Sequence, residues 1–326
     1  MNLKEIIYER YQNVLNSGDK VMLVNFPVHF NVGDQAIFLG EAKIIEFFGA
    51  SLVSVHSNFA VGDLETHIMR VLKNSKSLPV IAIHGGGSFG SIWPKEEIAR
   101  VRYLELAIKY SLKVIQFPQS VNFQDDFQLN SIEIIRKYQD QNEIYVFARD
   151  IPSQSALDKF GIKAILCPDS AHVLELMNES PSTAQFTILK RRDKESSNES
   201  LKYPGMEWDW VDSISKGMRF VRLMMRIYGG LGRYLPWGTN SYSRRYSMWF
   251  STKIMDSGLR RMQQSQIIYT DRLHAVLLSQ MSEIEVILVR DRYSKIRNYL
   301  ETWNLATNLK ILDAWPNDLK SFPKVG

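Results

Sequence analysis

The sequence predicts an α/β protein built from two doubly wound domains that face a cleft. Short apolar runs typical of buried strands alternate with segments of helical spacing along most of the chain. Such alternation indicates parallel sheets that helices cover on both faces. The 326 residues are enough for two domains of ordinary size, and Asn178–Thr183 has the composition of a linker. We therefore expect an N-terminal Rossmann-like domain at 1–177 and a C-terminal one at 184–326.

The first half carries most of the predicted elements. It begins with a buried strand at Lys20–Phe26 and a helix at Asp34–Phe48, which Gly49 closes. Further strands of this half are predicted at Ser51–Val55, Pro79–Ile83, Leu112–Phe117, Ile144–Phe147 and Ala164–Cys167. Further helices are predicted at Lys95–Tyr110 and Ile132–Tyr138. The second half has fewer units, with strands at Gln185–Leu189 and near Gln266, Glu285 and Leu309. Because ligands of open α/β sheets bind at the carboxyl ends of strands, the residues that follow these strands are the candidate site residues.

Composition and charge limit the class of protein. A hydrophobic content of 45% and a charged content of 23% are ordinary for a globular chain. The net charge of +5 suits an anionic substrate or membrane surface but is too small to argue for nucleic acid. One cysteine, Cys167, and six scattered histidines show no disulfide partner and no zinc spacing, so we expect no metal. No signal peptide and no run of 18 apolar residues are visible, which predicts a cytoplasmic protein.

The most informative segment is Thr270-Asp-Arg-Leu-His274, between an apolar strand and an apolar helix. Asp271 is a good N-cap at this junction, so Arg272 and His274 are expected in the first helical turn. There both can lean over an anion that rests on the free backbone N–H groups. The alternative, a surface arginine and a half-buried histidine, stays open on these residues alone.

Two further segments follow predicted strands. Asn31, Gly33 and Asp34 open the first helix, where the glycine permits a tight turn and the carboxylate can hold a sugar hydroxyl. The alternative is that Asp34 is only an N-cap. His84 precedes Gly85, Gly86 and Gly87, whose backbone can approach a ligand closely and leave N–H groups for phosphate or carboxylate. The G-x-G-x-x-G spacing of nucleotide sites is missing, and a flexible structural turn is the alternative.

The segment 216–250 is predicted as a basic amphipathic insertion in the second domain. Phe220, Leu223, Met224 and Ile227 follow helical spacing, and several arginines lie on another face, among them Arg219, Arg222 and Arg226. This pattern suits the surface of an anionic membrane. An ordinary surface helix with extended arginine side chains is the alternative.

Eight short motifs in order resemble the polysaccharide pyruvyl transferase family over most of the chain. They are Asn31-Val-Gly-Asp34-Gln-Ala-Ile, His84-Gly-Gly-Gly-Ser-Phe-Gly90, Phe117-Pro-Gln-Ser120, Ala148-Arg-Asp150, Pro168-Asp-Ser-Ala171, Arg191-Arg-Asp193-Lys-Glu195, Asp271-Arg-Leu-His274 and Tyr293-Ser-Lys295-Ile-Arg297. The resemblance implies a glycosyltransferase-B-like arrangement. It also implies transfer of pyruvate, as a cyclic ketal, from phosphoenolpyruvate to a sugar of a lipid-linked precursor in bacterial exopolysaccharide or cell-surface glycan synthesis.

The resemblance also implies roles for individual residues. Arg272 and Arg191 would clamp the donor, because planar guanidinium groups match both its carboxylate and its phosphate. His274 would be the acid/base, and Asp34 and His84 would orient acceptor hydroxyls or relay protons. The expected substrate-binding set is completed by Asn31, Gly33, Gly85, Gly86, Gly87, Gln119, Ser120 and Lys295. Phosphoenolpyruvate would be a co-substrate, and no cofactor is expected.

The chain departs from the family pattern at Ser88, Ser91, His172 and Arg290. These differences indicate either a different acceptor or weakened activity. Two alternatives therefore stay open: a nucleotide-sugar glycosyltransferase of the same fold, and a non-catalytic scaffold in a polysaccharide assembly complex. For the first, the sequence offers no base or ribose pocket. Retention of Arg191, Arg272 and His274 argues against the second.

Overall fold

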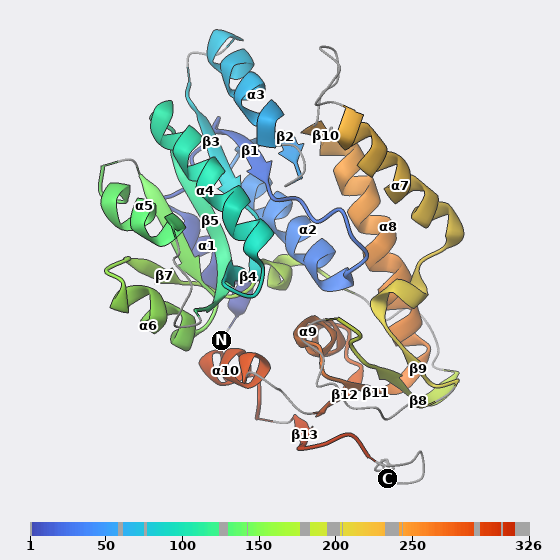
Figure 1. Cartoon of the computed structure of the whole chain (residues 1–326). Coiled ribbons are helices and arrows are strands. Elements are labelled where there is room, and N and C mark those ends of the chain that lie inside the picture. Colours follow the sequence, from blue (N-terminus) through green and yellow to red (C-terminus); the bar gives the residue numbers. More distant parts are fainter. Residues whose placement is uncertain are drawn as a thin grey trace. The chain divides into compact units, whose positions relative to one another are not determined.

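A computed structural model describes residues 2–57, 61–74, 77–123, 130–141, 143–176, 183–193, 203, 205–231, 241–242, 244–289, 294–307 and 309–316 (Figure 1). The chain divides into two compact units. Unit 1 comprises Met1–His29, Asp34–Leu174 and Lys216–Thr252, and unit 2 comprises Phe30–Gly33, Glu175–Ser215 and Lys253–Gly326. The α/β class predicted from the sequence is confirmed, because parallel strands alternate with helices in both units.

Unit 1 is organised around one sheet, in which eight strands pair among the described residues. In chain order its strands are β1 (Lys20–Val24), β2 (Ser51–His56), β3 (Pro79–Ile83), β4 (Gly86–Gly90), β5 (Val114–Asn122), β6 (Ile144–Ala148), β7 (Ala164–Leu166) and β10 (Ser241–Tyr242). Its helices are α1 (Leu3–Tyr11), α2 (Val32–Phe47), α3 (Val61–Asn74), α4 (Pro94–Lys109), α5 (Asn130–Tyr138), α6 (Ile151–Lys159), the short η2 (Ser170–Val173), α7 (Lys216–Leu231) and the start of α8 (Arg244–Gln263).

The strand order shows that this sheet is doubly wound. After β1 the chain places β2 on one side, then returns to place β3 on the other side and continues outward through β5, β6 and β7. All these pairs are parallel, and only the short β10 joins the β2 edge antiparallel. The reversal between β1 and β3 is a switch point, where the loops after two neighbouring strands diverge and leave room for a ligand.

Helices cover the strands of unit 1 and bury their apolar side chains. Met22 and Val24 of β1 pack in one cluster with Leu64 of α3 and with Tyr103 and Leu104 of α4. In Figure 1, α4 and α5 lie side by side along this sheet. The intervening β1 residues are buried as well, so both faces of the strand are covered, as a near-continuous apolar run predicts.

Unit 2 repeats the same winding with five strands among the described residues. Its elements are β8 (Ala184–Leu189), β9 (Glu207–Trp208), the short η3 (Trp210–Ser213), the end of α8, β11 (Ser265–Thr270), α9 (Leu273–Met281), β12 (Glu285–Val289), α10 (Lys295–Thr302) and β13 (Lys310–Leu312). The strand β9 lies on one side of β8, while β11, β12 and β13 continue on the other, all parallel. Its switch point therefore falls between β8 and β11.

The segment Lys216–Thr252 belongs to unit 1, whereas the sequence had placed 216–250 in the second domain as an insertion. Backbone pairing of β10 with β2 contributes to this difference, because it joins the segment to the first sheet. The Ser251 hydroxyl also donates to Gln35 Oε1 at 2.7 Å, and the Phe250 ring packs edge-on against Phe26. Within the part of the chain described, no helix is long and apolar enough to span a membrane.

Candidate active site

The carboxyl ends of β8 and β11 bring two distant segments of unit 2 together. The strands run in register to their last residues, where Thr270 pairs with Leu189. The Thr270 hydroxyl donates to the Leu189 carbonyl at 2.8 Å and accepts the Arg272 N–H at 3.1 Å. Residues after β8 and residues after β11 therefore leave the sheet side by side, at its switch point.

Two arginines converge there on one carboxylate. Arg191 binds Asp193 through two nitrogens, with Nε–Oδ1 at 2.9 Å and Nη2–Oδ2 at 3.1 Å. Arg272 Nη2 lies 3.4 Å from Asp193 Oδ2. Two guanidinium groups that hold one carboxylate could hold the carboxylate or phosphate of a substrate in the same way. The convergence expected of Arg191 and Arg272 is thus present within unit 2.

Arg272 is buried and depends on a second carboxylate. Its Nη2 lies 2.6 Å from Asp209 Oδ1, just after β9, and both side chains are nearly inaccessible to solvent. Asp209 also accepts the backbone N–H groups of Arg192 and Trp210. Separating the pair would leave two uncompensated charges in the interior, so this contact holds the guanidinium in position.

Asp271 does not have the role predicted for it. The N-cap of α9 is Arg272, which makes no side-chain cap bond, and Asp271 Oδ1 instead accepts the Arg191 N–H at 2.9 Å. The prediction was wrong because the neighbouring strand end, invisible in the local sequence, offers a competing donor. Burial, only partly offset by the Arg191 N–H and the two arginine charges, raises the pKa of Asp271 to about 6. Its Oδ2 is buried and has no hydrogen-bond partner among the described residues.

His274 is the second residue of α9, so it lies in the first turn as predicted, while Arg272 lies just before the helix. The imidazole packs directly against Gly33, where an added Cβ would lie 2.5 Å from His274 Cγ and Nδ1. Gly33 is helical and has no positive φ, so its predicted role in a tight turn was wrong. Close approach of the histidine ring requires glycine here. Asn31 Oδ1 accepts the Gly33 N–H at 3.1 Å.

The switch point of unit 1 holds a buried histidine–carboxylate pair. His84 follows β3, and its Nδ1 lies 2.8 Å from Glu41 Oε2 on α2. The other carboxylate oxygen accepts the Gly85 N–H at 2.7 Å. Burial alone would lower the pKa of His84, but the Glu41 charge and hydrogen bond, with smaller contributions from Asp34 and Asp169, outweigh it and raise the pKa. His84 Nε2 is buried and has no hydrogen-bond partner within the described ranges.

The triple glycine is not an open anion cradle throughout. The Gly85 N–H is bonded to Glu41, and Gly86–Gly90 forms β4 along β5. The Ser88 N–H donates to Gln119 Oε1 at 3.0 Å. Gly86 adopts φ +113°, which only glycine takes up readily, and its missing Cβ would face Asp34 Oδ1 at 3.8 Å. The glycines therefore allow β4 to lie close to α2, and the prediction of unpaired N–H groups was wrong for Gly85.

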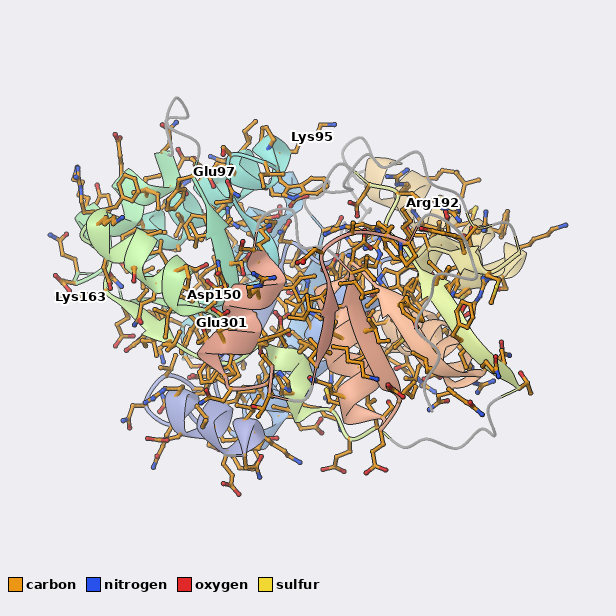
Figure 2. The ribbon with its side chains drawn as sticks, turned by 90° about the horizontal axis from the view of Figure 1, so that it is seen from below. Lys95, Glu97, Asp150, Lys163, Arg192 and Glu301 are labelled. Atoms are coloured by element: carbon orange, nitrogen blue, oxygen red, sulfur yellow. The ribbon has the colours of Figure 1, made fainter. Side chains whose placement is uncertain are left out.

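Gln119 and Ser120 of β5 make hydrogen bonds that hold neighbouring segments of unit 1 in place. Gln119 Nε2 donates to the His84 carbonyl at 2.8 Å, and Gln116 Nε2 reaches the same oxygen at 3.2 Å. The Ser120 hydroxyl donates to Asp150, the N-cap of α6 that Figure 2 labels, and accepts from Arg149 Nε at 2.7 Å. These contacts hold the residues that follow β3 and β6. Direct contact with substrate stays a prediction for both side chains.

The remaining predicted residues are placed as follows. Asp34 lies in the first turn of α2 rather than at its N-cap, with Oδ2 3.5 Å from His29 Nε2. Lys295 opens α10, and its role in substrate binding stays a prediction. Ser88 lies in β4, Ser91 directly follows that strand, and His172 lies in η2. Arg290, the fourth departure from the family pattern, falls outside the described residues.

Three residues of these sites were not predicted: Glu41, Asp193 and Asp209. Glu41 is the only charged residue in the apolar stretch from Ala36 to Ala42, and a lone buried carboxylate is a signal that could have found it. Asp193 lies in the motif Arg191-Arg-Asp193-Lys-Glu195, but the sequence assigned a role there only to Arg191. Asp209 gave no signal, because its partner is 63 residues away in the chain. No group of three histidine, cysteine or acidic residues that could hold a metal ion occurs among the residues described.

Two sheets with the same winding, parallel except at β10, define an α/β protein of Rossmann-like type, and one of them carries paired arginines at its switch point. The sequence pattern described as "Polysaccharide pyruvyl transferase" matches residues 31–293. The chain therefore belongs to the polysaccharide pyruvyl transferase family, whose name describes transfer of pyruvyl groups to polysaccharide.

Known proteins agree with this assignment. "Pyruvyl transferase 1" of Schizosaccharomyces pombe is 27% identical over 91% of this chain and 73% of its own length. "Putative pyruvyl transferase EpsO" of Bacillus subtilis is 24% identical over 89% of this chain and 87% of its own. A crystal structure of an uncharacterized Klebsiella pneumoniae protein matches with a TM-score of 0.61 at 13% identity, covering 96% of this chain and all of that one. This last likeness concerns the fold alone.

Proposed function

We propose that the protein transfers pyruvate from phosphoenolpyruvate to two hydroxyls of one sugar, forming a cyclic ketal and releasing phosphate. The observation that carries the proposal is the convergence of Arg191 and Arg272 on Asp193. The donor carries a carboxylate and a phosphate, and paired guanidinium groups can bind either one bidentately. The start of α9 adds backbone N–H groups beside them, and these also favour an anion.

Donor binding replaces one anion by another. Asp193 is partly exposed and neutralises both arginines, so the carboxylate or phosphate of the donor takes over its hydrogen bonds. Asp209 keeps Arg272 in place meanwhile, because that pair is buried. The guanidinium groups then stabilise the charge on the departing phosphate.

The chemistry requires proton transfers that a histidine can perform. Protonation at C3 of the enol phosphate makes C2 electrophilic, and the first sugar hydroxyl adds to C2 and loses its proton. The C2–O bond to phosphate breaks with its electron pair, and the second hydroxyl closes the ring and loses its proton as well. One of the two hydroxyl protons balances the proton gained at C3, and the other leaves with phosphate or solvent. His274, held against Gly33 beside Arg272, is the acid/base for these steps.

The acceptor is a sugar residue of a polysaccharide precursor, which we propose to be lipid-linked. The His84–Glu41 pair and Asp34 orient its hydroxyls or relay protons, since His84 Nε2 is the polar atom this pair leaves available. The relative named EpsO is consistent with exopolysaccharide synthesis as the setting. A cytoplasmic location at the inner face of the plasma membrane belongs to the same proposal.

Calorimetric titration of the full chain with phosphoenolpyruvate and with a uridine diphosphate sugar tests the donor. We expect binding of phosphoenolpyruvate and none of the nucleotide sugar. With a competent acceptor, phosphate release should require phosphoenolpyruvate. Binding of the nucleotide sugar alone would favour a glycosyltransferase instead. Donor binding without turnover on any tested glycan would favour the non-catalytic scaffold.

A further inference from the structure

The helix α7 carries a row of apolar side chains on its solvent side. Phe220 is 62% exposed, Leu223 54%, Met224 46% and Ile227 45%. Their spacing of three, four and seven residues places them along one face of the helix. Other large exposed apolar residues of unit 1, such as Ile98 on α4, do not form such a row on their own helix. A contiguous apolar surface of this kind marks an interaction site.

The orientation of α7 is the reverse of that of an ordinary surface helix. Such a helix turns its regularly spaced apolar residues toward the core. Here the opposite side packs inward, with Met225 2% exposed and Val221 half-buried. The exposed row is therefore not used by the packing of the described residues of unit 1. The row is therefore not the core-facing side of the helix.

The charged residues of α7 itself are all basic. Lys216, Arg219 and Arg226 are exposed, and the sequence of α7 contains no acidic residue. Arg222 is half-buried on the inner side. An exposed apolar row bordered by lysine and arginine complements a surface that offers both acyl chains and anionic headgroups. A second copy of the same face would bring like charges together, which disfavours self-association.

We propose that α7 lies in the interface of an anionic lipid membrane, with Phe220, Leu223 and Ile227 at the acyl boundary and the three exposed basic residues at the headgroups. This inference goes beyond pyruvyl transfer and does not depend on it. If the acceptor is lipid-linked, α7 holds the protein on the surface where that acceptor is found.

Flotation of the full chain with vesicles tests the proposal. Wild type should float with vesicles of equal parts phosphatidylglycerol and phosphatidylcholine, not with phosphatidylcholine alone, and should dissociate as salt rises. Each basic residue near such a surface contributes about a factor of five in affinity, so K216Q/R219Q/R226Q should bind roughly a hundredfold more weakly. Replacing Phe220, Leu223 and Ile227 by Ala should weaken binding more than about tenfold while preserving helix propensity.

Matched controls separate this face from general surface effects. Ile98→Ala removes an exposed apolar side chain from α4, and K137Q/K159Q/K163Q removes three exposed charges from the same unit. Lys163 points outward in Figure 2. Both controls should bind as wild type does, and circular dichroism should show all variants folded. Equal binding by the α7 variants, or no binding by wild type, would overturn the proposal. So would an α7-dependent dimer in light scattering without vesicle binding.

Discussion

The two switch points arise from the same strand winding but carry different functional groups. In unit 2 the ends of β8 and β11 present Arg191 and Arg272, with carboxylates that fix them. In unit 1 the end of β3 presents His84, which is paired with the buried Glu41 of α2. The winding explains why residues far apart in sequence meet at each place, and the residue types decide what each place can do. The arginines of unit 2 are suited to binding an anion, and the histidine of unit 1 is suited to proton transfer.

Our proposal gives donor chemistry to unit 2 and acceptor chemistry to unit 1, and variants can break this division. The largest effect is expected for His274→Ala, which removes the proposed acid/base but leaves both arginines. Turnover should fall roughly 10²–10⁴-fold, the usual share of general acid–base catalysis, while the Kd for phosphoenolpyruvate stays nearly unchanged. Steady-state phosphate release and calorimetry measure the two quantities. Full activity of this variant would remove His274 from the mechanism.

Gly33→Ala tests whether the position of the same histidine matters. Alanine favours a helix, but its Cβ would lie 2.5 Å from the His274 ring, which must therefore move. A displacement of about 1 Å lowers catalysis by up to about 10²-fold, so we expect kcat to fall about ten- to hundredfold with donor affinity kept. Gly18→Ala is a poor control because of its positive φ, whereas Ser155→Ala on the exposed side of α6 is a neutral one. Unchanged kcat would mean that the ring contact has no catalytic consequence.

Arg191→Ala should act on the donor rather than on the chemistry. The side chain is less buried than Arg272, so its loss should leave the fold intact. Loss of a charge-assisted pair costs about 1.5–3 kcal/mol, which is about a ten- to hundredfold increase in the Kd for phosphoenolpyruvate. The control is Arg192→Ala, because Arg192 pairs with Asp212 and is nearly half exposed. Equal effects of the two variants would contradict a specific donor clamp.

Glu41→Gln should produce the smallest change, a shift in pH dependence. The carboxylate raises the pKa of His84, so its removal lowers that pKa. Activity that needs protonated His84 is lost as pH rises through this pKa, and in the variant the loss should begin at lower pH. Glutamine can still accept the Gly85 N–H, so the kcat at the optimum should change less than about tenfold. Glu46→Gln, on the exposed side of the same helix, should leave the profile unchanged. A lower kcat without a shift would indicate a structural role only.

The sequence by itself determined the α/β class and most strands, because apolar runs alternating with helical spacing leave few other ways to bury the chain. Strands such as β3 at Pro79–Ile83 were predicted with their observed bounds. The sequence also singled out Arg272, His274 and His84, since all three follow predicted strands. Arg191 was singled out by the family resemblance. The Asp271 cap failed, because local propensity cannot include a donor that arrives from β8.

The tertiary structure decided which residues meet. Pairing of β8 with β11 brings the Arg191 N–H to Asp271. The packing of α2 places Glu41 next to His84. No local sequence pattern links the residues of either pair. The tertiary structure also shows why position 33 is glycine. The His274 ring packs against it and leaves no space for a side chain. The orientation of α7 is the clearest case. Its periodicity shows that one face is apolar, but only packing against the rest of unit 1 determines that this face is the exposed one.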